Sequence, residues 1–214
     1  MLRYVAVEFF IAQKKVFFMI VLLLQITTLI GAYIVGSVPT GFIVARLAGV
    51  SDIRQHGSGN IGATNVARIL GKKFFALVLL LDAGKAYACL ALLASLGASK
   101  EFLCLAALAL LLGNSASIFL RFTGGKGVAV TVGSLLFLAP SIVLVALCVW
   151  FAILGLTRTV GFASVVAALG VVIMGVVMIY TQNDPVTLTS IVMALWVVVL
   201  HSKNMSNLKI FCRR

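Results

Sequence analysis

Long apolar runs separated by short polar stretches make up most of this chain. Runs of about 20 apolar residues are typical of helices that cross a lipid bilayer. We therefore predict an all-α, polytopic integral membrane protein. The apolar segments that we expect to form its helices are 16–35, 74–96, 102–120, 128–156, 160–180 and 186–200.

The segment 128–156 leaves the number of crossings open, because Pro140 stands near its middle. If it crosses once, the basic C-terminal tail lies opposite the basic stretches 46–73 and 121–126. If the chain turns at Pro140, the tail and both basic stretches lie on the same side of the membrane. This second arrangement is favoured, because Lys and Arg are enriched in cytoplasmic loops. The two resulting helices would each be only about 21 Å long, so they would pack inside the bundle or thin the membrane. We thus predict about seven transmembrane helices, with short polar loops in the cytoplasm and the N-terminus outside.

The chain is predicted to hold one membrane domain, residues 16–202, between an N-terminal extension, 1–15, and a basic cytoplasmic tail, 203–214. Lys14 and Lys15 precede the first apolar run as in a signal peptide, but no clear small-residue cleavage site follows. We therefore expect an uncleaved first helix. In the predicted topology both lysines lie on the outer side, against the positive-inside rule.

The composition supports a membrane protein, since 63% of the residues are hydrophobic, 10% are charged and the mean hydropathy is +1.21. The net charge of +12 comes from 17 basic and five acidic residues. We assign most of it to cytoplasmic loops and the rest to anionic substrates, because no basic tract interleaved with aromatic residues indicates nucleic-acid binding. The four cysteines show no metal-ligand spacing, so we predict packing thiols, no metal and no cofactor.

Glycine, small hydroxyl, amide and arginine residues are concentrated in the stretch 52–68. Glycines let backbone N–H groups converge on a ligand, and amides and arginines add donors, so this stretch predicts a loop that binds phosphate or another anion. Residues 57–62 match G-x-G-x-x-G, but the dinucleotide interpretation needs a βαβ unit, which membrane helices exclude. Residues 124–127, Gly-Gly-Lys-Gly, lack two features of a Walker A loop, the Ser or Thr and the upstream glycine. They predict either a second anion nest or a simple turn between helices.

Further polar residues are expected to converge on the same face. Asp82 and Lys85 lie three residues apart on one helix face, and because an unpaired buried charge is costly we expect them to pair with each other or with the polar loops. Arg158 is predicted to be a phosphate ligand rather than a snorkelling side chain. His201 and Asn204 lie one turn apart, which favours a role in a site over a helix cap.

Together, these motifs resemble the bacterial membrane acyl-phosphate:glycerol-3-phosphate acyltransferases, the PlsY family. The resemblance runs from Val21 to the tail, and the motif within 52–65 is the most specific part. The matching stretches, in chain order, are 36–41, 52–54, 56–60, 62–65, 70–73, Asp82 with Lys85, 124–129, Thr157 with Arg158, and His201 with Asn204.

The resemblance implies a seven-helix enzyme of the bacterial cytoplasmic (inner) membrane, with its active site facing the cytoplasm. It would transfer a fatty acyl group from acyl phosphate to the 1-hydroxyl of sn-glycerol 3-phosphate. The products would be lysophosphatidic acid and phosphate, in the first step of phospholipid synthesis. Its substrates would be acyl phosphate and glycerol 3-phosphate, and it would contact membrane lipid. Its protein partners stay open, with the enzyme that forms acyl phosphate as one candidate. Nucleic acid is not among its partners.

The same resemblance supplies roles for the polar residues. The 57–65 loop and Lys126 would hold the acyl-phosphate head, the arginines would hold the glycerol phosphate, and His56 stays open between a general base and a loop donor. The predicted catalytic residues are Ser37, Asn65, Lys126, His201 and Asn204. The predicted substrate-binding residues are Arg46, His56, Gly57, Ser58, Gly59, Asn60, Thr64, Arg68, Gly124, Gly125, Gly127 and Arg158.

No lipase-like turn or Ser-His-Asp arrangement is visible, so direct attack by the substrate hydroxyl is our preferred mechanism. An acyl intermediate on Ser37 is the alternative. The chain departs from the family pattern at Asn114, where histidine is usual, at Gly161, where serine is expected, and at Asn207, where arginine is usual. The tail also ends without a Gly-Glu pair, so a restructured C-terminal site stays open.

A transporter for an anionic solute is the competing prediction from another class of protein. Inverted repeats or helices interrupted in both halves would favour it, and neither is visible in the sequence. A third alternative is a structural membrane subunit, which only the C-terminal departures favour.

Overall fold

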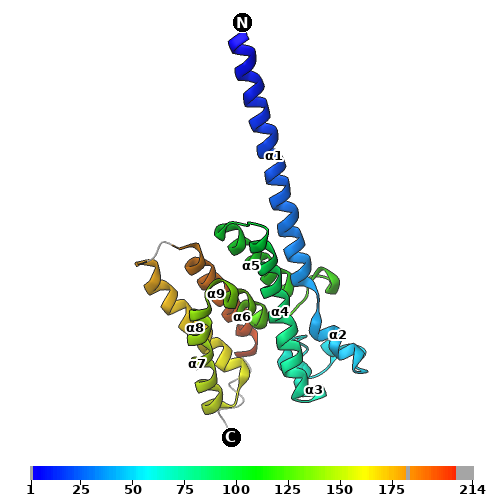
Figure 1. Cartoon of the computed structure of the whole chain (residues 1–214). Helices are drawn as coiled ribbons and strands as arrows, with labels where there is room; N and C mark the ends of the chain where they lie inside the picture. The colour runs from blue at the N-terminus through cyan, green and yellow to red at the C-terminus, as the bar shows by residue number, and fades with distance from the viewer. Residues whose placement is uncertain (1, 182–183, 206–214) are drawn as a thin grey trace.

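The computed structural model describes residues 2–181 and 184–205, and side chains for Phe10, 13–181 and 184–201. All regular structure in these residues is helical (Figure 1). The α-helices are α1 (Leu2–Ser37), α2 (Thr40–Leu47), α3 (Ala63–Leu70), α4 (Lys73–Ser95), α5 (Lys100–Ser115), α6 (Val128–Leu138), α7 (Pro140–Thr157), α8 (Val160–Ile179) and α9 (Pro185–Met205). Two 3₁₀ turns, η1 (Ile53–Gln55) and η2 (Ile118–Leu120), lie in the connections.

Four helical stretches in the described part of the chain are long and apolar enough to cross a membrane: Gln13–Leu47, Lys73–Ser95, Pro140–Thr157 and Val160–Ile179. Shorter apolar helices cover Val128–Leu138 and Pro185–His201. The predicted all-α, polytopic membrane fold is therefore confirmed. Of the two short helices expected from the segment 128–156, only α6 is short, with 11 residues, whereas α7, with 18 residues, is long enough to cross a membrane.

The chain does turn at Pro140, as the charge pattern predicts. Pro140 occupies the first turn of α7, where its missing N–H costs no hydrogen bond, whereas inside a continuous helix it would break one. On one side of the break α6 packs along α4, with the rings of Phe137 and Tyr87 5.5 Å apart. On the other side α7 packs against α8, where Trp150 Nε1 donates to Ser164 Oγ at 3.1 Å.

Helix α1 begins at Leu2, so residues 2–15, which we set apart as an extension, continue the first apolar helix. The first glycine in α1 is Gly31, and no proline precedes it, so no helix-breaking residue interrupts the helix before that point. Figure 1 shows its N-terminal half standing away from the bundle. The C-terminal half packs closely on α5, because a Cβ on Gly113 would collide with the Tyr33 carbonyl. The Tyr33 hydroxyl also donates to the Ala116 carbonyl at 2.7 Å.

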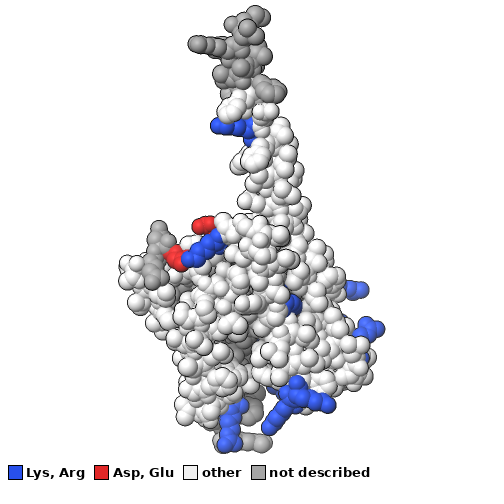
Figure 2. All heavy atoms as spheres, in the orientation of Figure 1, with Lys and Arg blue, Asp and Glu red and all other residues white. Residues whose placement is uncertain are grey.

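Basic side chains gather at the end of the molecule where α2 and α3 lie and where α7 ends (Figure 2). At the opposite end of the bundle, Lys100 at the start of α5 forms an ion pair with Asp184 at 2.6 Å. This separation of charge is the one that the turn at Pro140 predicts. The exposed basic residues in the connections and helix ends, apart from Lys100, are Arg46, Arg54, Arg68, Lys72, Lys73, Arg121 and Arg158.

Candidate active site

The bundle contains a cavity of about 960 Å³ whose lining changes from polar to apolar. The polar part is formed by the loop before α3, by Arg68, by Lys126 and by His201. The apolar part lies between α6, α7, α8 and α9. Such a cavity suits a ligand with an anionic head and a long apolar tail. Its apolar lining includes Leu135, Val143, Leu147, Val165, Ala168, Val171 and Val197.

The loop that precedes α3 is held in shape by the side chain of Asn65. Asn65 is buried, and its Nδ2 donates to the backbone carbonyls of His56 and Asn60, both at 2.9 Å. Its Oδ1 accepts from the backbone N–H of Ser58 at 2.8 Å and from Arg68 Nη1 at 3.2 Å. The carboxamide that we predicted to be catalytic is therefore engaged with the loop. It fixes the backbone that faces the cavity.

The backbone conformation of this loop depends on glycine residues. Gly57 (φ 61°) and Gly59 (φ 72°) have left-handed backbone, and a Cβ at Gly57 would collide with Oδ1 of Asn65. Asn60 Oδ1 accepts from the Gly62 N–H at 3.0 Å, immediately before α3. Gly62 lines the cavity together with the first residues of that helix. Because the first N–H groups of a helix have no partner within it, this end of α3 is suited to an anion.

Two side chains of α3 lie beside this helix end. Thr64 lies in the first turn and Arg68 one turn further along, and both are exposed side chains that line the cavity. Beyond its bond to Asn65, Arg68 has no ion pair among the described residues. Its other N–H donors are therefore available to a phosphate.

The Gly-Gly-Lys-Gly loop forms the other polar wall. Gly125 donates its N–H to the Asn114 carbonyl at 2.9 Å, and a Cβ on Gly124 would collide with that same carbonyl. Gly127 (φ 76°) precedes α6 in the left-handed conformation. Between them Lys126 is half-buried, lines the cavity and has no carboxylate partner in the described part of the chain. Burial lowers the pKa of Lys126, and an anionic ligand would compensate for that burial.

His201 lies on α9, where the cavity meets the start of α8. Its ring is buried, and Nδ1 lies 2.8 Å from the Val197 carbonyl, so Nδ1 donates and Nε2 is left as the acceptor. Gly161 is close by, since a Cβ there would lie 3.8 Å from His201 Cδ2. Asn204 is also on α9, but its side chain lies outside the described residues. Asn207 and the tail beyond it lie outside them altogether.

Ser37 lies away from the cavity, at the last residue of α1. It is fully buried against α5, and its carbonyl accepts a hydrogen bond from Ser117 Oγ at 2.6 Å. A Cβ on Gly113 would lie 2.8 Å from the Ser37 nitrogen. Its hydroxyl has no hydrogen-bond partner among the described residues. Its surroundings are those of a packed helix junction.

Other predicted ligands also lie outside the cavity lining. The side chains of Arg46, at the end of α2, and His56, in the loop, are exposed. Arg158 caps α7 with left-handed backbone (φ 54°) and is exposed, while its neighbour Thr159 lines the cavity. Gly59 and Gly124 shape their loops without lining the cavity. The structure thus brings together the 57–65 loop, Arg68, the 125–127 loop and His201.

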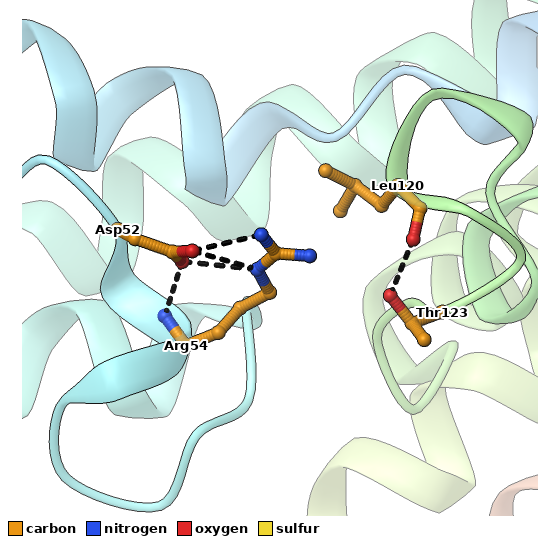
Figure 3. Close-up of polar contacts among 4 residues, drawn as sticks. All are labelled: Asp52, Arg54, Leu120 and Thr123. Carbon is orange, nitrogen blue, oxygen red and sulfur yellow. Dashed lines mark hydrogen bonds and ion pairs between the residues drawn. The ribbon is translucent and has the colours of Figure 1, made fainter.

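The loop between α2 and α3 contains a local ion pair between Asp52 and Arg54 (Figure 3). Arg54 Nη2 lies 2.7 Å from Asp52 Oδ2, and the backbone N–H of Arg54 donates to Asp52 Oδ1 at 2.9 Å. This pairing lowers the pKa of Asp52 to about 2. The Thr123 hydroxyl donates to the Leu120 carbonyl at 2.6 Å and closes the turn before the Gly-Gly-Lys-Gly loop. Both turns are local contacts that shape the connections around the cavity.

The predicted ion pair on α4 is present. Lys85 Nζ lies 2.7 Å from Asp82 Oδ1, and the Thr40 hydroxyl donates to the same oxygen at 2.6 Å. Lys85 also donates to the Val38 carbonyl at 2.7 Å. These contacts tie α4 to the bend between α1 and α2, which carries Pro39. Asp82 also lines the cavity.

Some cavity residues were not among the predicted site residues. Asn114, noted only as a departure from a family pattern, is buried and lines the cavity beside Gly125. Thr131 on α6 also lines it and was missed entirely. The available signal was a hydroxyl inside the run Val128–Leu138, because polar groups within a membrane helix are costly.

The fold and the site together define a class of protein: a helical membrane protein whose cavity is lined both by polar groups suited to an anion and by apolar side chains. Comparison with known proteins narrows that class. The family model described as glycerol-3-phosphate acyltransferase matches residues 26–210. Among curated glycerol-3-phosphate acyltransferases, one from Synechococcus sp. (strain JA-2-3B'a(2-13)) is 42% identical over 187 residues, which cover 87% of this chain and 92% of the relative. One from Syntrophotalea carbinolica is 38% identical over 182 residues, covering 84% and 91%.

Solved structures agree with the sequence relatives. The crystal structure of PlsY (YgiH), an integral membrane glycerol 3-phosphate acyltransferase, in its glycerol 3-phosphate form has a TM-score of 0.77 and 34% sequence identity. The match covers 89% of this chain and 94% of that one. The lysophosphatidic acid form of PlsY gives a TM-score of 0.75 at 33% identity, covering 89% and 93%. This chain belongs to the PlsY family of membrane glycerol-3-phosphate acyltransferases.

Proposed function

We propose that this protein transfers a fatty acyl group from acyl phosphate to the 1-hydroxyl of glycerol 3-phosphate. The products are lysophosphatidic acid and inorganic phosphate. The observation that carries the proposal is a cavity of about 960 Å³ in which groups suited to bind phosphate adjoin an apolar lining. Acyl phosphate combines a phosphate head with a hydrocarbon tail, and it matches both parts of the lining.

The proposed binding roles follow from the groups that line the polar part. The 57–65 loop, with the first turn of α3, holds one phosphate through backbone N–H groups. Arg68 and Lys126 supply positive charge from opposite loops. Family relatives carry glycerol 3-phosphate in their name, and a PlsY structure holds it. We assign the second phosphate, that of glycerol 3-phosphate, to this same cluster, with Arg46, Arg158 and Asn204 as further candidate ligands.

The chemistry we propose is direct attack of the glycerol hydroxyl on the acyl carbon. Ser37 is fully buried and does not line the cavity, which supports direct attack over an acyl-serine intermediate. His201 offers Nε2 to orient the glycerol hydroxyl, because Nδ1 is engaged with the Val197 carbonyl. The departing phosphate takes the hydroxyl proton. Catalysis in this proposal comes from positioning and from fixed hydrogen-bond donors.

We propose further that the polar loops face the cytoplasm of a bacterial inner membrane. Most of the exposed Lys and Arg residues gather at one end of the bundle (Figure 2), and such residues collect on the cytoplasmic side. Substrates made in the cytoplasm would then reach the pocket directly. The enzyme that forms acyl phosphate is the protein partner we propose for that side.

The test is an assay of purified protein, supplied with lipid, using palmitoyl phosphate and labelled glycerol 3-phosphate. We expect labelled lysophosphatidic acid and an equal amount of phosphate. Lys126→Ala should abolish most of the product, and acyl-CoA in place of palmitoyl phosphate should give none. Lack of product in a folded sample contradicts the proposal, and product from acyl-CoA contradicts the proposed donor.

A further inference from the structure

Helix α6 carries two buried hydroxyl groups that the fold does not use. Thr131 Oγ1 and Ser134 Oγ have no hydrogen-bond partner among the described residues. Other buried helical hydroxyls donate to the carbonyl four residues earlier, as Ser190 does to Val186 at 2.7 Å and Ser164 does to Val160 at 2.9 Å, whereas Ser37 at the end of α1 is likewise unpaired among the described residues. An unpaired buried hydroxyl costs stability, so its presence on α6 needs an explanation.

The two hydroxyls differ in what they face. Thr131 is 8% exposed and lines the cavity, whereas Ser134 is fully buried and does not line it. Ser134 is therefore packed away from the cavity, whereas Thr131 is a residue of the cavity lining whose hydroxyl is buried and unpaired among the described residues. Ser134 therefore serves as a control for Thr131, because both hydroxyls are buried and unpaired in the described part of the chain but only Thr131 belongs to the cavity lining.

Thr131 is the polar residue among the described α6 residues that line the cavity, the others being Val128, Ala129, Val132 and Leu135. The helix starts after Gly127, and Thr131 lies between that glycine and the lining residue Leu135. Thr131 lies one helical turn from each, and four residues of α-helix span about 6 Å. The loop that holds Lys126 precedes α6, and Leu135 lies further along the helix among the apolar lining residues.

In an acyl phosphate the carbonyl group occupies the matching position. It is joined to the phosphate through one oxygen, and the hydrocarbon chain begins on its other side. If the phosphate lies at Lys126 and the chain lies along Leu135, the carbonyl oxygen falls at the level of Thr131. We propose that the Thr131 hydroxyl donates a hydrogen bond to this acyl carbonyl oxygen and stabilises the oxyanion that forms there. The inference rests on the proposed function, because it assumes an acyl phosphate donor.

The role is specific to the transition state. The glycerol oxygen forms a bond to the carbonyl carbon, and the carbonyl oxygen takes up the negative charge. The bond from that carbon to the phosphate oxygen then breaks, and phosphate leaves with the proton of the glycerol hydroxyl. A donor aimed at the carbonyl oxygen strengthens as the charge develops, so it raises kcat more than it lowers KM.

The experiment compares wild type with Thr131→Val, Thr131→Ser and Ser134→Ala, each purified with lipid and assayed with palmitoyl phosphate and glycerol 3-phosphate. Val keeps the shape of Thr and removes the hydroxyl, whereas Ser keeps the hydroxyl. We expect T131V to lower kcat on the order of 100-fold, as loss of one oxyanion donor does elsewhere, with both KM values within about threefold of wild type. T131S and S134A should keep kcat within about threefold, and T131V should melt no lower than S134A.

Three results would overturn the inference. An unchanged kcat in T131V shows that the hydroxyl does not act in the reaction. Equal losses in T131V and T131S show that shape rather than hydrogen bonding matters. A rise in the KM for palmitoyl phosphate at constant kcat shows ground-state binding only. If wild type itself gives no product, the proposed function fails together with the inference, whereas an active wild type with an equally active T131V removes the inference alone.

Discussion

The Nζ of Lys85 lies 2.7 Å from the carbonyl oxygen of Val38, so a charged side chain inside α4 fixes the bend between α1 and α2. The same Nζ pairs with Asp82 at 2.7 Å, and both side chains are nearly buried. A break at Pro39 leaves carbonyl groups of α1 without helical donors. The lysine supplies one such donor, and the aspartate neutralises its charge.

Replacement of Lys85 by Met should destabilise the fold strongly. It leaves Asp82 buried without its cation, which costs about 3–5 kcal/mol of unfolding free energy. The double variant D82N/K85M should recover part of this loss, because no unpaired charge remains. Thermal unfolding of the purified protein measures both. As a control, Lys100→Met breaks an exposed ion pair with Asp184 and should cost about 0–1 kcal/mol, so equal losses at the two sites would contradict the interpretation.

Asn65 should prove essential through the loop that it holds. Asn65→Asp keeps an acceptor for Ser58 but removes the donor to two backbone carbonyls and adds a negative charge beside the anion site. We expect kcat/KM for palmitoyl phosphate to fall by about 100-fold, equivalent to about 3 kcal/mol of lost interaction. His56→Ala is the matched control, because His56 takes part through its backbone carbonyl, so this variant should keep near-normal activity. An unchanged kcat/KM in N65D would show that the loop holds its shape without this amide.

The activity should decline in alkaline solution because of Lys126. Burial lowers the pKa of Lys126 below its usual 10.5, and only the charged form attracts phosphate. The kcat/KM for palmitoyl phosphate should therefore fall at a pH below 10.5. Lys126→Arg stays charged throughout and should move this decline to higher pH, even if its maximal rate is lower. A pH profile that is identical in both proteins would assign the decline to another group.

Lys126 should also make the stability of the protein depend on pH, but here a rise in pH is favourable. Because the pKa of Lys126 is lower in the folded state, the unfolded chain binds more protons in the interval between the lowered pKa and 10.5. Without a ligand, the unfolding free energy contributed by this residue should rise with pH across that interval. Comparison of wild type and K126R unfolding over the same pH range isolates the contribution.

Two glycines in the bundle should respond differently to alanine. A Cβ at Gly133 would collide with the Ala83 carbonyl, because α6 and α4 approach closely there. Gly133→Ala should therefore cost about 1–3 kcal/mol of unfolding free energy through overpacking. A Cβ at Gly161 would lie at ordinary contact distance, 3.8 Å from His201 Cδ2, so Gly161→Ala should be neutral or slightly stabilising. Similar melting temperatures for the two variants would contradict the close helix approach.

Much of the fold follows from local sequence features. The segment 74–96 was predicted to be apolar and helical, and α4 runs over Lys73–Ser95. The segment 160–180 agrees equally well with α8, Val160–Ile179. Pro140 marks the break between α6 and α7, because proline is accepted in a first helical turn and not in a helix interior. Each of these features depends on near neighbours in the chain.

Other boundaries depend on contacts that the sequence does not show. The segment 102–120 was predicted to be one apolar run, but α5 ends at Ser115. The chain then turns, since the Ser117 N–H donates to the Thr123 carbonyl at 3.2 Å, and η2 follows. Hydrophobicity alone does not distinguish such a turn from further helix, because both are apolar.

The sequence by itself determined that this protein is an all-α membrane protein with two glycine-rich loops. Apolar length, charge placement and backbone freedom are properties of short stretches, and they appear directly in the residues. Only the tertiary structure decided which predicted groups share one cavity. It placed Lys126 and His201 in the lining, left Ser37 packed against α5 and added Thr131. The reason is physical: the exposure of a side chain on a buried helix depends on the helices that cover it, and those come from distant parts of the chain.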